Sequence, residues 1–494
     1  MMSETLRKAR AYEEERLPHV PAELLPHYHV TGGVGWINDP NGFSLYKGEY
    51  HLFFQYYPYD TKWASMHWGH VKTKNFLRWE RLPCALAPDE DYDRDGCFSG
   101  SAIELSDGRH MLIYTGVRKN RDGGGEEDEF QTQCLAFGDG VDYEKYAGNP
   151  VITAELLPEG GSARDFRDPK IWQENGRYYV VAGDRCPDGS GAILLYESED
   201  ALCWRYVGTL AASGNRHGRM WECPDFFRLD GKHVLLTSPQ EMKAEGLEFI
   251  YGNTTLCLIG QLDRERCELI REHTQTIDYG LDFYAPQTVE TADGRRVMIA
   301  WMQYWNSVDI RPREGLPFFG QMTVPRELRV RDGRLIQNPV RELQAYRGAR
   351  VSRIDVPVSG ELTLPGVRGR CLDMTVDIRP GSGEMYRGFT VWTAEGGEYG
   401  TSIRYDPAKS TVLVDRRRSG FPAEVQNERE FVVRENGGVL RLRILLDRYS
   451  LELFVNDGEQ AATFTVFAPE EADGIRFEAD GEVRMDIDKY ELRF

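Results

Sequence analysis

Apolar residues along most of the chain occur in short runs that directly follow a turn dipeptide, a pattern typical of β-hairpins. The five clearest runs begin after Lys47-Gly48, Asp107-Gly108, Asn175-Gly176, Asp230-Gly231 and Asp293-Gly294. The turn glycines are 60, 68, 55 and 63 residues apart, a spacing that fits four-stranded blades with long loops. The pattern therefore predicts a five-bladed β-propeller.

A second repeat supports this interpretation. Residues 73–79 and 198–204 share a hydroxyl, an Asn or Asp, a Leu and a Trp in the same order. Any β-rich protein contains glycine hairpins, and that plainer alternative has to be weighed. Five evenly spaced hairpins favour the propeller.

The two ends of the chain have a different pattern. Helix-forming residues dominate 3–16, and Pro18 stops them, so residues 1–26 are predicted to form a helical extension of the propeller at 27–337. A helix-like stretch at 339–346 marks a linker over 338–349. From 350 to 494 polar and apolar residues alternate, which predicts a β-sandwich and an all-β fold class for the whole chain.

Composition and charge narrow the function. The 494 residues include 60 basic and 79 acidic ones, and the net charge of −19 excludes nucleic acid and acidic membranes as partners. No apolar run is long enough for a membrane span or a signal peptide, so a cytoplasmic location is expected. Nine cysteines without a C-x-x-C pair suggest neither a disulfide framework nor a zinc site.

The candidate chemistry lies eight or nine residues before each hairpin glycine, where the strand that leads into the hairpin begins. These positions hold Asp39, Ser99, Asp168, Glu222 and Ala285. In a propeller the innermost strands start near the axis, so the three acids are predicted to share one pocket.

The sequence around each acid suggests its ionisation state. Arg167 beside Asp168 is expected to keep that carboxylate ionised, and Trp221 beside Glu222 is expected to raise the pKa of its carboxyl group by desolvation. One ionised and one protonated carboxyl group are what glycoside hydrolysis requires. Two of the acids also have a plainer, structural interpretation. Asp39 lies in the turn-forming sequence Asn-Asp-Pro-Asn-Gly, and Asp168 could form a structural ion pair with its neighbour.

Aromatic and polar residues lie near the same strand starts or in the loops that follow. Trp36, Trp63, Phe98, Tyr284 and Trp301 could stack on sugar rings, while Gln55 and Asp282 could form hydrogen bonds with hydroxyl groups. The alternative for each aromatic residue is packing in the core.

Taken in order, several motifs resemble the family 32 glycoside hydrolases, the group of invertases, sucrose-6-phosphate hydrolases and fructanases. The matching segments are Trp36–Gly42, Phe53–Tyr56, Trp63 with Met66–His70, Phe98–Ser101, Arg167–Pro169, Trp221–Asp225 and Asp282–Ala285. They cover the predicted propeller motif by motif, and the sandwich matches by position only.

The resemblance implies a retaining β-fructofuranosidase that needs no metal and no organic cofactor. Asp39 would be the nucleophile, Glu222 the acid and then the base, and Asp168 would stabilise the transition state. The substrate, a small carbohydrate such as sucrose, sucrose 6-phosphate or a short fructan, would contact Asn38, Gln55, Trp63, Phe98, Ser99, Arg167, Asp282, Tyr284 and Trp301. The residues alone identify neither fructose nor which aspartate attacks.

Other functions use the same residues. A fructosyltransferase or a phosphorylase would keep all three acids. A non-catalytic sugar-binding propeller would not need them. A propeller that serves only as a scaffold for protein partners is disfavoured by the acids at its axis. Plain sucrose or short fructo-oligosaccharides are predicted to be adequate substrates. Candidate phosphate ligands are His217, Arg219, Arg311 and Arg313. The oligomeric state stays open, with a homodimer as one option.

Overall fold

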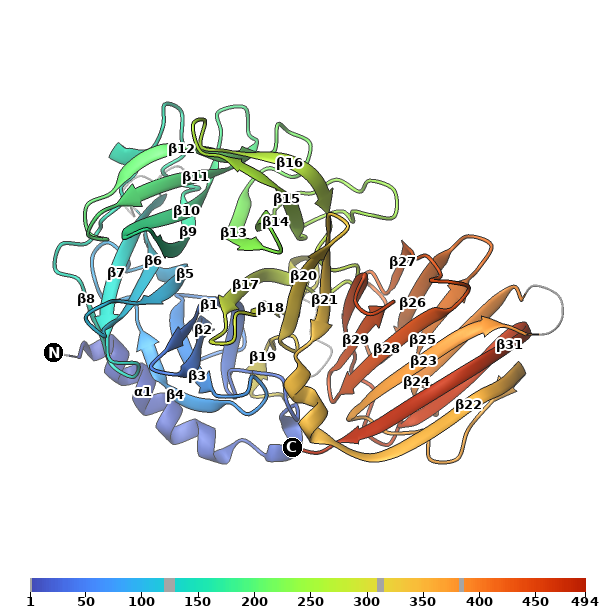
Figure 1. The fold of residues 1–494 in the computed structure, drawn as a ribbon. Helices are drawn as coiled ribbons and strands as arrows, with labels where there is room; N and C mark the ends of the chain where they lie inside the picture. The colour runs from blue at the N-terminus through green and yellow to red at the C-terminus, as the bar shows by residue number, and fades with distance from the viewer. Residues whose placement is uncertain (1, 120–128, 309–314, 382–385) are drawn as a thin grey trace.

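The computed structural model describes residues 2–119, 129–308, 315–381 and 386–494. Five sheets form a ring, and a larger folded sheet packs beside it (Figure 1). The predicted all-β fold class, a five-bladed propeller followed by a β-sandwich, is confirmed. The domain boundaries given above stay predictions.

Each blade is an antiparallel sheet in which the chain runs outward from the axis. Blade 1 contains β1 (Gly35–Tyr46), β2 (Glu49–Tyr57), β3 (His67–Thr73) and β4 (Glu80–Leu86). Blade 2 contains β5 (Gly96–Glu104), β6 (His110–Lys119), β7 (Glu129–Gly138) and β8 (Tyr143–Lys145). Blade 3 contains β9 (Arg167–Glu174), β10 (Arg177–Arg185), β11 (Gly191–Ser198) and β12 (Arg205–Ala212). Blade 4 contains β13 (Trp221–Leu229), β14 (Lys232–Pro239), β15 (Leu256–Asp263) and β16 (Glu268–Gln275), and blade 5 contains β17 (Tyr284–Glu290), β18 (Arg296–Trp301), β20 (Arg326–Arg331) and β21 (Arg334–Pro339).

Short elements close and brace the ring. The strand β19 (Phe318–Phe319) pairs in parallel with β1, so blade 5 is tied to blade 1 and the inner edge of blade 1 is covered. Helix α1 (Glu4–Arg16) is capped by Ser3 and lies against β4, where Glu13 accepts a hydrogen bond from the Cys84 amide. The 3₁₀ helices are η1 (Leu17–His19), η2 (Ala22–Leu24), η4 (Ala154–Leu156), η5 (Trp305–Ser307) and η6 (Arg341–Tyr346).

The innermost strand of every blade is irregular near its start. The pairing register slips between Ile37 and Pro40, between Phe98 and Gly100, between Glu222 and Asp225, between Tyr284 and Gln287, and opposite Asp168. The backbone has a positive φ of 64° at Asp168, 48° at Cys223 and 51° at Ala285. Because a bulge redirects the side chains around it, these irregularities aim residues of each strand at the axis.

The second domain is one sheet folded on itself. Its strands are β22 (Arg347–Leu362), β23 (Leu372–Pro380), β24 (Gly388–Gly396), β25 (Tyr399–Asp406), β26 (Thr411–Arg418), β27 (Glu428–Val432), β28 (Leu440–Asp447), β29 (Ser450–Val455), β30 (Gln460–Thr465) and β31 (Gly474–Leu492). The long strand β31 pairs with β24 through its first half and with β23 through its second half. It therefore joins the two layers, whose apolar faces share one core.

The two domains are held together by a buried network of charges. His29 faces Asp447 Oδ2 at 2.8 Å through Nδ1 and Glu452 Oε1 at 2.9 Å through Nε2. Arg326 continues the network by donating to Glu452 and to Asp278. Burial by itself would lower the pKa of His29, but the two carboxylates outweigh it and raise the pKa to about 9. Both ring nitrogens therefore carry protons at neutral pH.

This network makes stability depend on pH. Because the pKa of His29 is higher in the folded state than its ordinary 6.5, its stabilisation is complete below about pH 6.5 and is lost as the pH rises through about 9. A rise in pKa of this size corresponds to a contribution of His29 to the free energy of unfolding on the order of 3 kcal/mol. Urea unfolding across this pH range should show the loss in wild type. The His29→Gln variant should have a lower free energy of unfolding than wild type at the acidic end of this range, and that free energy should hardly change with pH. If the variant loses stability with rising pH as steeply as wild type, His29 is not the group responsible.

Candidate active site

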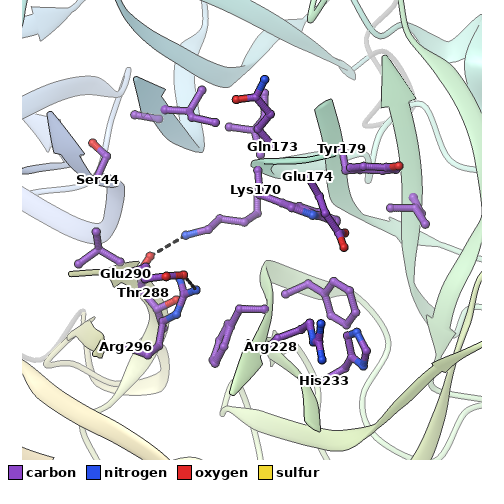
Figure 2. A pocket seen from close by; sticks show the side chains of 18 of the residues that line it. Ser44, Lys170, Gln173, Glu174, Tyr179, Arg228, His233, Thr288, Glu290 and Arg296 are labelled. Carbon is purple, nitrogen blue, oxygen red and sulfur yellow. Dashed lines mark hydrogen bonds and ion pairs between the residues drawn. The ribbon is translucent and has the colours of Figure 1, made fainter. Parts of the chain in front are cut away.

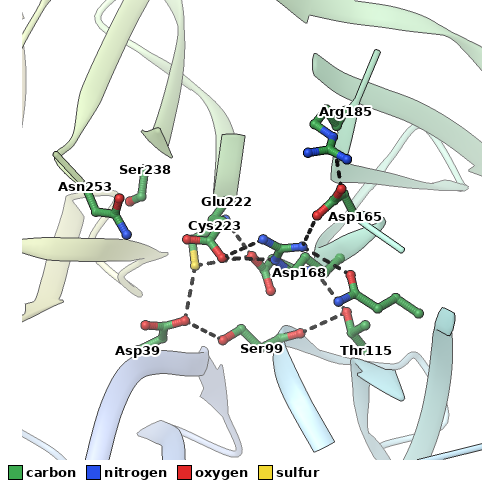
Figure 3. Close-up of polar contacts among 12 residues, drawn as sticks. Asp39, Ser99, Thr115, Asp165, Asp168, Arg185, Glu222, Cys223, Ser238 and Asn253 are labelled. Atoms are coloured by element: carbon green, nitrogen blue, oxygen red, sulfur yellow. Dashed lines mark hydrogen bonds and ion pairs between the residues drawn. The ribbon is translucent and has the colours of Figure 1, made fainter. Parts of the chain in front are cut away.

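The three predicted acids meet at the propeller axis. Asp39 comes from β1, Asp168 from β9 and Glu222 from β13 (Figure 3). The Cys223 thiol bridges two of them, with its Sγ atom 3.4 Å from Asp39 Oδ2 and 3.5 Å from Asp168 Oδ2. Residues that lie 129 and 54 positions apart in the sequence thus form one cluster of carboxylates.

Asp39 is buried and accepts hydrogen bonds on both carboxylate oxygens. The Ser99 hydroxyl donates to Oδ2 at 2.7 Å, and the Asn38 amide donates to Oδ1 at 3.1 Å while accepting from the Trp36 indole. Burial raises the pKa of Asp39, these hydrogen bonds lower it, and the nearby charge of Glu222 raises it further. Two donors that the sequence analysis selected, Asn38 and Ser99, therefore fix the orientation of this carboxylate.

Asp168 differs from the expectation. Burial raises its pKa to about 7; the charge of Arg167 opposes this rise, and the charges of Glu222 and Asp39 add to it. Arg167 acts in the predicted direction by favouring the ionised form, but burial and the two neighbouring acids outweigh its charge. Its Oδ2 accepts the Cys223 amide at 2.9 Å, and its own amide donates to Thr115 Oγ1.

Glu222 is the acid that Arg167 contacts. Arg167 donates to Glu222 Oε1 from Nε at 3.0 Å and from Nη2 at 2.9 Å. The Tyr284 hydroxyl lies 2.5 Å from the other oxygen, Oε2, and 3.1 Å from the Ser238 carbonyl oxygen. The indole of Trp221, the residue predicted to desolvate Glu222, packs in the core of blades 3 and 4 and donates to the His217 carbonyl oxygen.

Three further residues of the predicted set lie around the cluster. Gln55 is buried on β2 and donates to the Cys97 carbonyl oxygen at 3.0 Å, beside the strand that carries Ser99. Trp63 is 43% exposed in the loop after β2 and meets Phe98 edge to face, with ring centroids 5.9 Å apart. This pair is the part of the predicted aromatic set that keeps an exposed ring.

Two predicted contact residues point elsewhere. Asp282 is fully buried against the second domain, where it accepts hydrogen bonds from Thr465 and pairs with Arg416. Trp301 is also fully buried and packs beside Trp36 and Trp305. The Trp36 ring stacks on that of Phe319, with ring centroids 4.6 Å apart. In this structure neither Trp36 nor Trp301 presents a free ring face to a sugar, so both belong to the core.

The sequence analysis missed two residues of the cluster. Cys223 follows Glu222 directly, and only the bulge turns its thiol toward Asp39 and Asp168. Thr115 lies on β6, and its hydroxyl accepts the Asp168 amide. Each innermost strand contains a turn or bulge signal at these positions, so Cys223 could have been suspected from its place between Glu222 and Pro224. No sequence signal identifies Thr115.

A buried ion pair closes the axis beneath the acids. Lys170 on β9 donates to Asp225 Oδ2 at 2.9 Å and to the Thr288 carbonyl oxygen at 2.8 Å. Beyond it, at the opposite mouth, lies a cavity of about 560 Å³ lined by the second halves of the inner strands (Figure 2). That cavity contains none of the three acids, so the chemistry belongs to the mouth where the strands begin.

One group of residues has a composition that could hold a metal ion. Ligand atoms of His27, Cys371 and Asp447 lie within 4.8 Å of one another at the domain interface. Both Asp447 oxygens already accept hydrogen bonds, including those from His27 and His29. None of these residues belongs to the acid cluster.

The chain is similar to known proteins both in sequence and in structure. The family model "Glycosyl hydrolases family 32 N-terminal domain" matches residues 29–339, and "Glycosyl hydrolases family 32 C terminal" matches residues 342–493. A sucrose-6-phosphate hydrolase of Zymomonas mobilis is 36% identical over 90% of this chain and 86% of its own length. A raffinose invertase of Escherichia coli is 37% identical over 90% of this chain and 89% of its own length. The structure of a GH32 beta-fructofuranosidase from Bombyx mori is 34% identical, with a TM-score of 0.82 over 99% of this chain and 98% of that one.

Proposed function

Since the chain belongs to glycoside hydrolase family 32, we propose that its three axial acids carry out the family's reaction. The protein is a β-fructofuranosidase that hydrolyses sucrose or its phosphate. The proposal concerns which residue does what. The observation that supports it most strongly is the convergence of Asp39, Asp168 and Glu222 at the bulges of three inner strands.

Asp39 is proposed as the nucleophile. Hydrogen bonds from Ser99, Asn38 and the Cys223 thiol stabilise its ionised form and hold it in one orientation. An oriented carboxylate can attack the anomeric carbon of the fructosyl ring and form a covalent ester, while the leaving sugar departs with a proton. Water then cleaves the ester, and the configuration at the anomeric carbon is retained.

Glu222 is proposed as the acid and later the base. Its Oε1 atom accepts two N–H groups from Arg167, so a proton on this carboxyl group belongs on Oε2. The Tyr284 hydroxyl at 2.5 Å serves both states of that oxygen. It donates to Oε2 when Glu222 is ionised, and it accepts from Oε2 while donating to the Ser238 carbonyl oxygen when Glu222 is protonated.

Asp168 is proposed to bind fructose hydroxyl groups. Burial raises the pKa of this carboxyl group to about 7, so in the free site it is partly protonated near neutral pH. Hydroxyl groups that donate to Asp168 would favour its ionised form. Substrate binding would in this way prepare Asp168 to stabilise the transition state through the fructose hydroxyl groups.

The same site could transfer the fructosyl group to a sugar or to phosphate. Nothing in the cluster distinguishes water from another acceptor. Product analysis at high sucrose, with and without inorganic phosphate, decides this. Equal release of glucose and fructose supports hydrolysis, whereas glucose in excess over fructose indicates transfer.

Substrate choice is tested by comparing sucrose with sucrose 6-phosphate. Of the four candidate phosphate ligands, His217 is buried, Arg219 lies 3.4 Å from Glu241, and Arg311 and Arg313 lie outside the described residues. We expect plain sucrose to be an adequate substrate, because a protein with a net charge of −19 repels the doubly charged sucrose 6-phosphate. A preference for the phosphate above about 30-fold in kcat/KM, roughly 2 kcal/mol, that weakens with salt would overturn this expectation.

Location and assembly remain open to measurement. No helix within the described ranges has the length and apolar character to cross a membrane. The cytoplasmic location and a homodimer stay predictions of the sequence, which cell fractionation and light scattering can test.

A further inference from the structure

One buried ion pair connects the second domain to the strand that carries Tyr284. Arg416 on β26 pairs through Nη1 with Asp282 Oδ2. The same oxygen accepts the Thr465 amide at 2.7 Å and the Thr465 hydroxyl at 2.8 Å. Arg416 is 1% exposed and Asp282 is fully buried. Two charges that are so completely removed from water persist only where each compensates the other.

The second domain holds the Arg416 guanidinium on every nitrogen. Nη1 donates to the Thr465 carbonyl oxygen at 3.1 Å, Nε to Asn427 Oδ1 at 3.3 Å, and Nη2 to the Gln426 carbonyl oxygen at 3.3 Å. The guanidinium carbon also lies 3.9 Å from the centre of the Phe421 ring. The cation therefore has one defined position, which Asp282 has to meet.

The chain that leads to Tyr284 runs along β30 of the second domain. The amides of Leu281 and Asp282 both donate to the Thr463 carbonyl oxygen at 3.1 Å, and the Tyr279 amide donates to that of Ala461. At Gly280 a Cβ atom would lie 2.1 Å from the Thr463 carbonyl oxygen, so only glycine permits this approach. Two residues after Asp282, the chain enters β17 at Tyr284.

From these contacts we infer that Arg416 is a positioning residue for catalysis: by anchoring Asp282 it sets the place of the Tyr284 hydroxyl against Glu222. The inference rests on the proposed role of Glu222 as acid and base. No part of Arg416 touches the acid cluster, so its effect passes through Asp282 and the backbone of residues 282–284. The second domain thereby takes part in the chemistry of the propeller.

The expected consequence follows from the short contact at Glu222. A displaced Tyr284 no longer holds Oε2 of Glu222, the oxygen proposed to carry the transferable proton. Proton donation from Oε2 of Glu222 to the leaving group should therefore become less efficient, and a substrate that depends on this donation should suffer most.

The test uses Arg416→Lys in the full chain, because lysine keeps the charge but cannot supply the fork of donors. We expect kcat/KM for sucrose to fall about tenfold or more. The kcat/KM for p-nitrophenyl β-D-fructofuranoside, which reports the first step and whose leaving group needs little proton donation, should change less than about threefold. Tyr284→Phe should give the same pattern, and the double variant should be no worse than Tyr284→Phe alone.

Arg448→Lys is the matched control. Arg448 is another buried arginine of the second domain, and it donates to the carbonyl oxygens of Ala22 and Glu23 in the N-terminal segment. This variant should lower the melting temperature without changing kcat/KM for either substrate. If Arg416→Lys behaves in the same way, or if its effect adds to that of Tyr284→Phe, the inference is wrong.

A second variant covers the case in which Arg416→Lys does not fold. Asp282→Asn keeps the size of the side chain, removes its charge, and should show the same split between sucrose and the aryl fructoside. The proposed function is judged separately. If Glu222→Gln remains fully active, the role of Glu222 fails whatever Arg416 does. If Glu222→Gln is inactive and both anchor variants change only the melting temperature, the positioning role alone fails.

Discussion

Asp39→Asn should abolish turnover of sucrose while the protein stays folded. An amide of nearly the same shape keeps the packing at this buried position but cannot attack the anomeric carbon. The loss in kcat should be several orders of magnitude, as is typical when a nucleophile is removed. Steady-state kinetics, together with circular dichroism and the melting temperature, provide the measurement. Residual kcat above about a tenth of wild type, a difference of only ~1.4 kcal/mol, would remove Asp39 from the nucleophile role.

Two further observations sharpen this prediction. Ser99→Ala deletes one hydrogen bond to Asp39 and keeps the nucleophile, so its loss should be far smaller than that of Asp39→Asn. In wild type, nuclear magnetic resonance during the first turnovers should show fructose released in its β form before mutarotation. Release of the α form would mean inversion and would exclude a covalent ester on Asp39.

Glu222→Gln should have the second-largest effect, and the effect should depend on the leaving group. Glutamine cannot donate a proton to the glucosyl oxygen of sucrose, so fructosyl transfer to the enzyme should nearly stop. With p-nitrophenyl β-D-fructofuranoside the first step should survive and the second, which lacks its base, should limit the rate. Rapid mixing should then show a burst of nitrophenol. Comparable losses in the first step on both substrates would argue against an acid at this position.

Arg167 offers a matched comparison for Glu222. It donates two hydrogen bonds to Oε1 but carries no transferable proton at neutral pH. By disturbing the orientation of Glu222, Arg167→Lys should therefore also affect sucrose more than the aryl fructoside, but by a smaller factor than Glu222→Gln, because the carboxyl group can still donate its proton. The contrast with Glu222→Gln separates the holding of the carboxyl group from its proton transfer.

Arg167 forms an ion pair with Glu222 and not with the adjacent Asp168. The sequence places Arg167 next to Asp168, and adjacency suggests a pair. In the structure the guanidinium donates two hydrogen bonds to Glu222, 55 positions later in the sequence. Its charge also lowers the pKa of Asp168, but burial outweighs this effect and raises that pKa to about 7.

Much of the fold follows from the sequence because its signals are local. A turn glycine, an apolar run and their regular spacing are enough to count the blades. The same spacing locates Asp39, Asp168 and Glu222, because equivalent strand positions in a propeller meet at the axis. Identification of all three acids required no knowledge of any side-chain direction.

Side-chain direction is what only the tertiary structure decided. Asp282 and Trp301 lie in motifs close to the site, yet Asp282 pairs with Arg416, 134 positions later in the sequence, and Trp301 packs in the core. Cys223 and Thr115 reach the cluster only through a bulge and through the neighbouring blade. Directions at irregular backbone positions depend on long-range partners, and local patterns of hydrophobic and polar residues do not encode those partners.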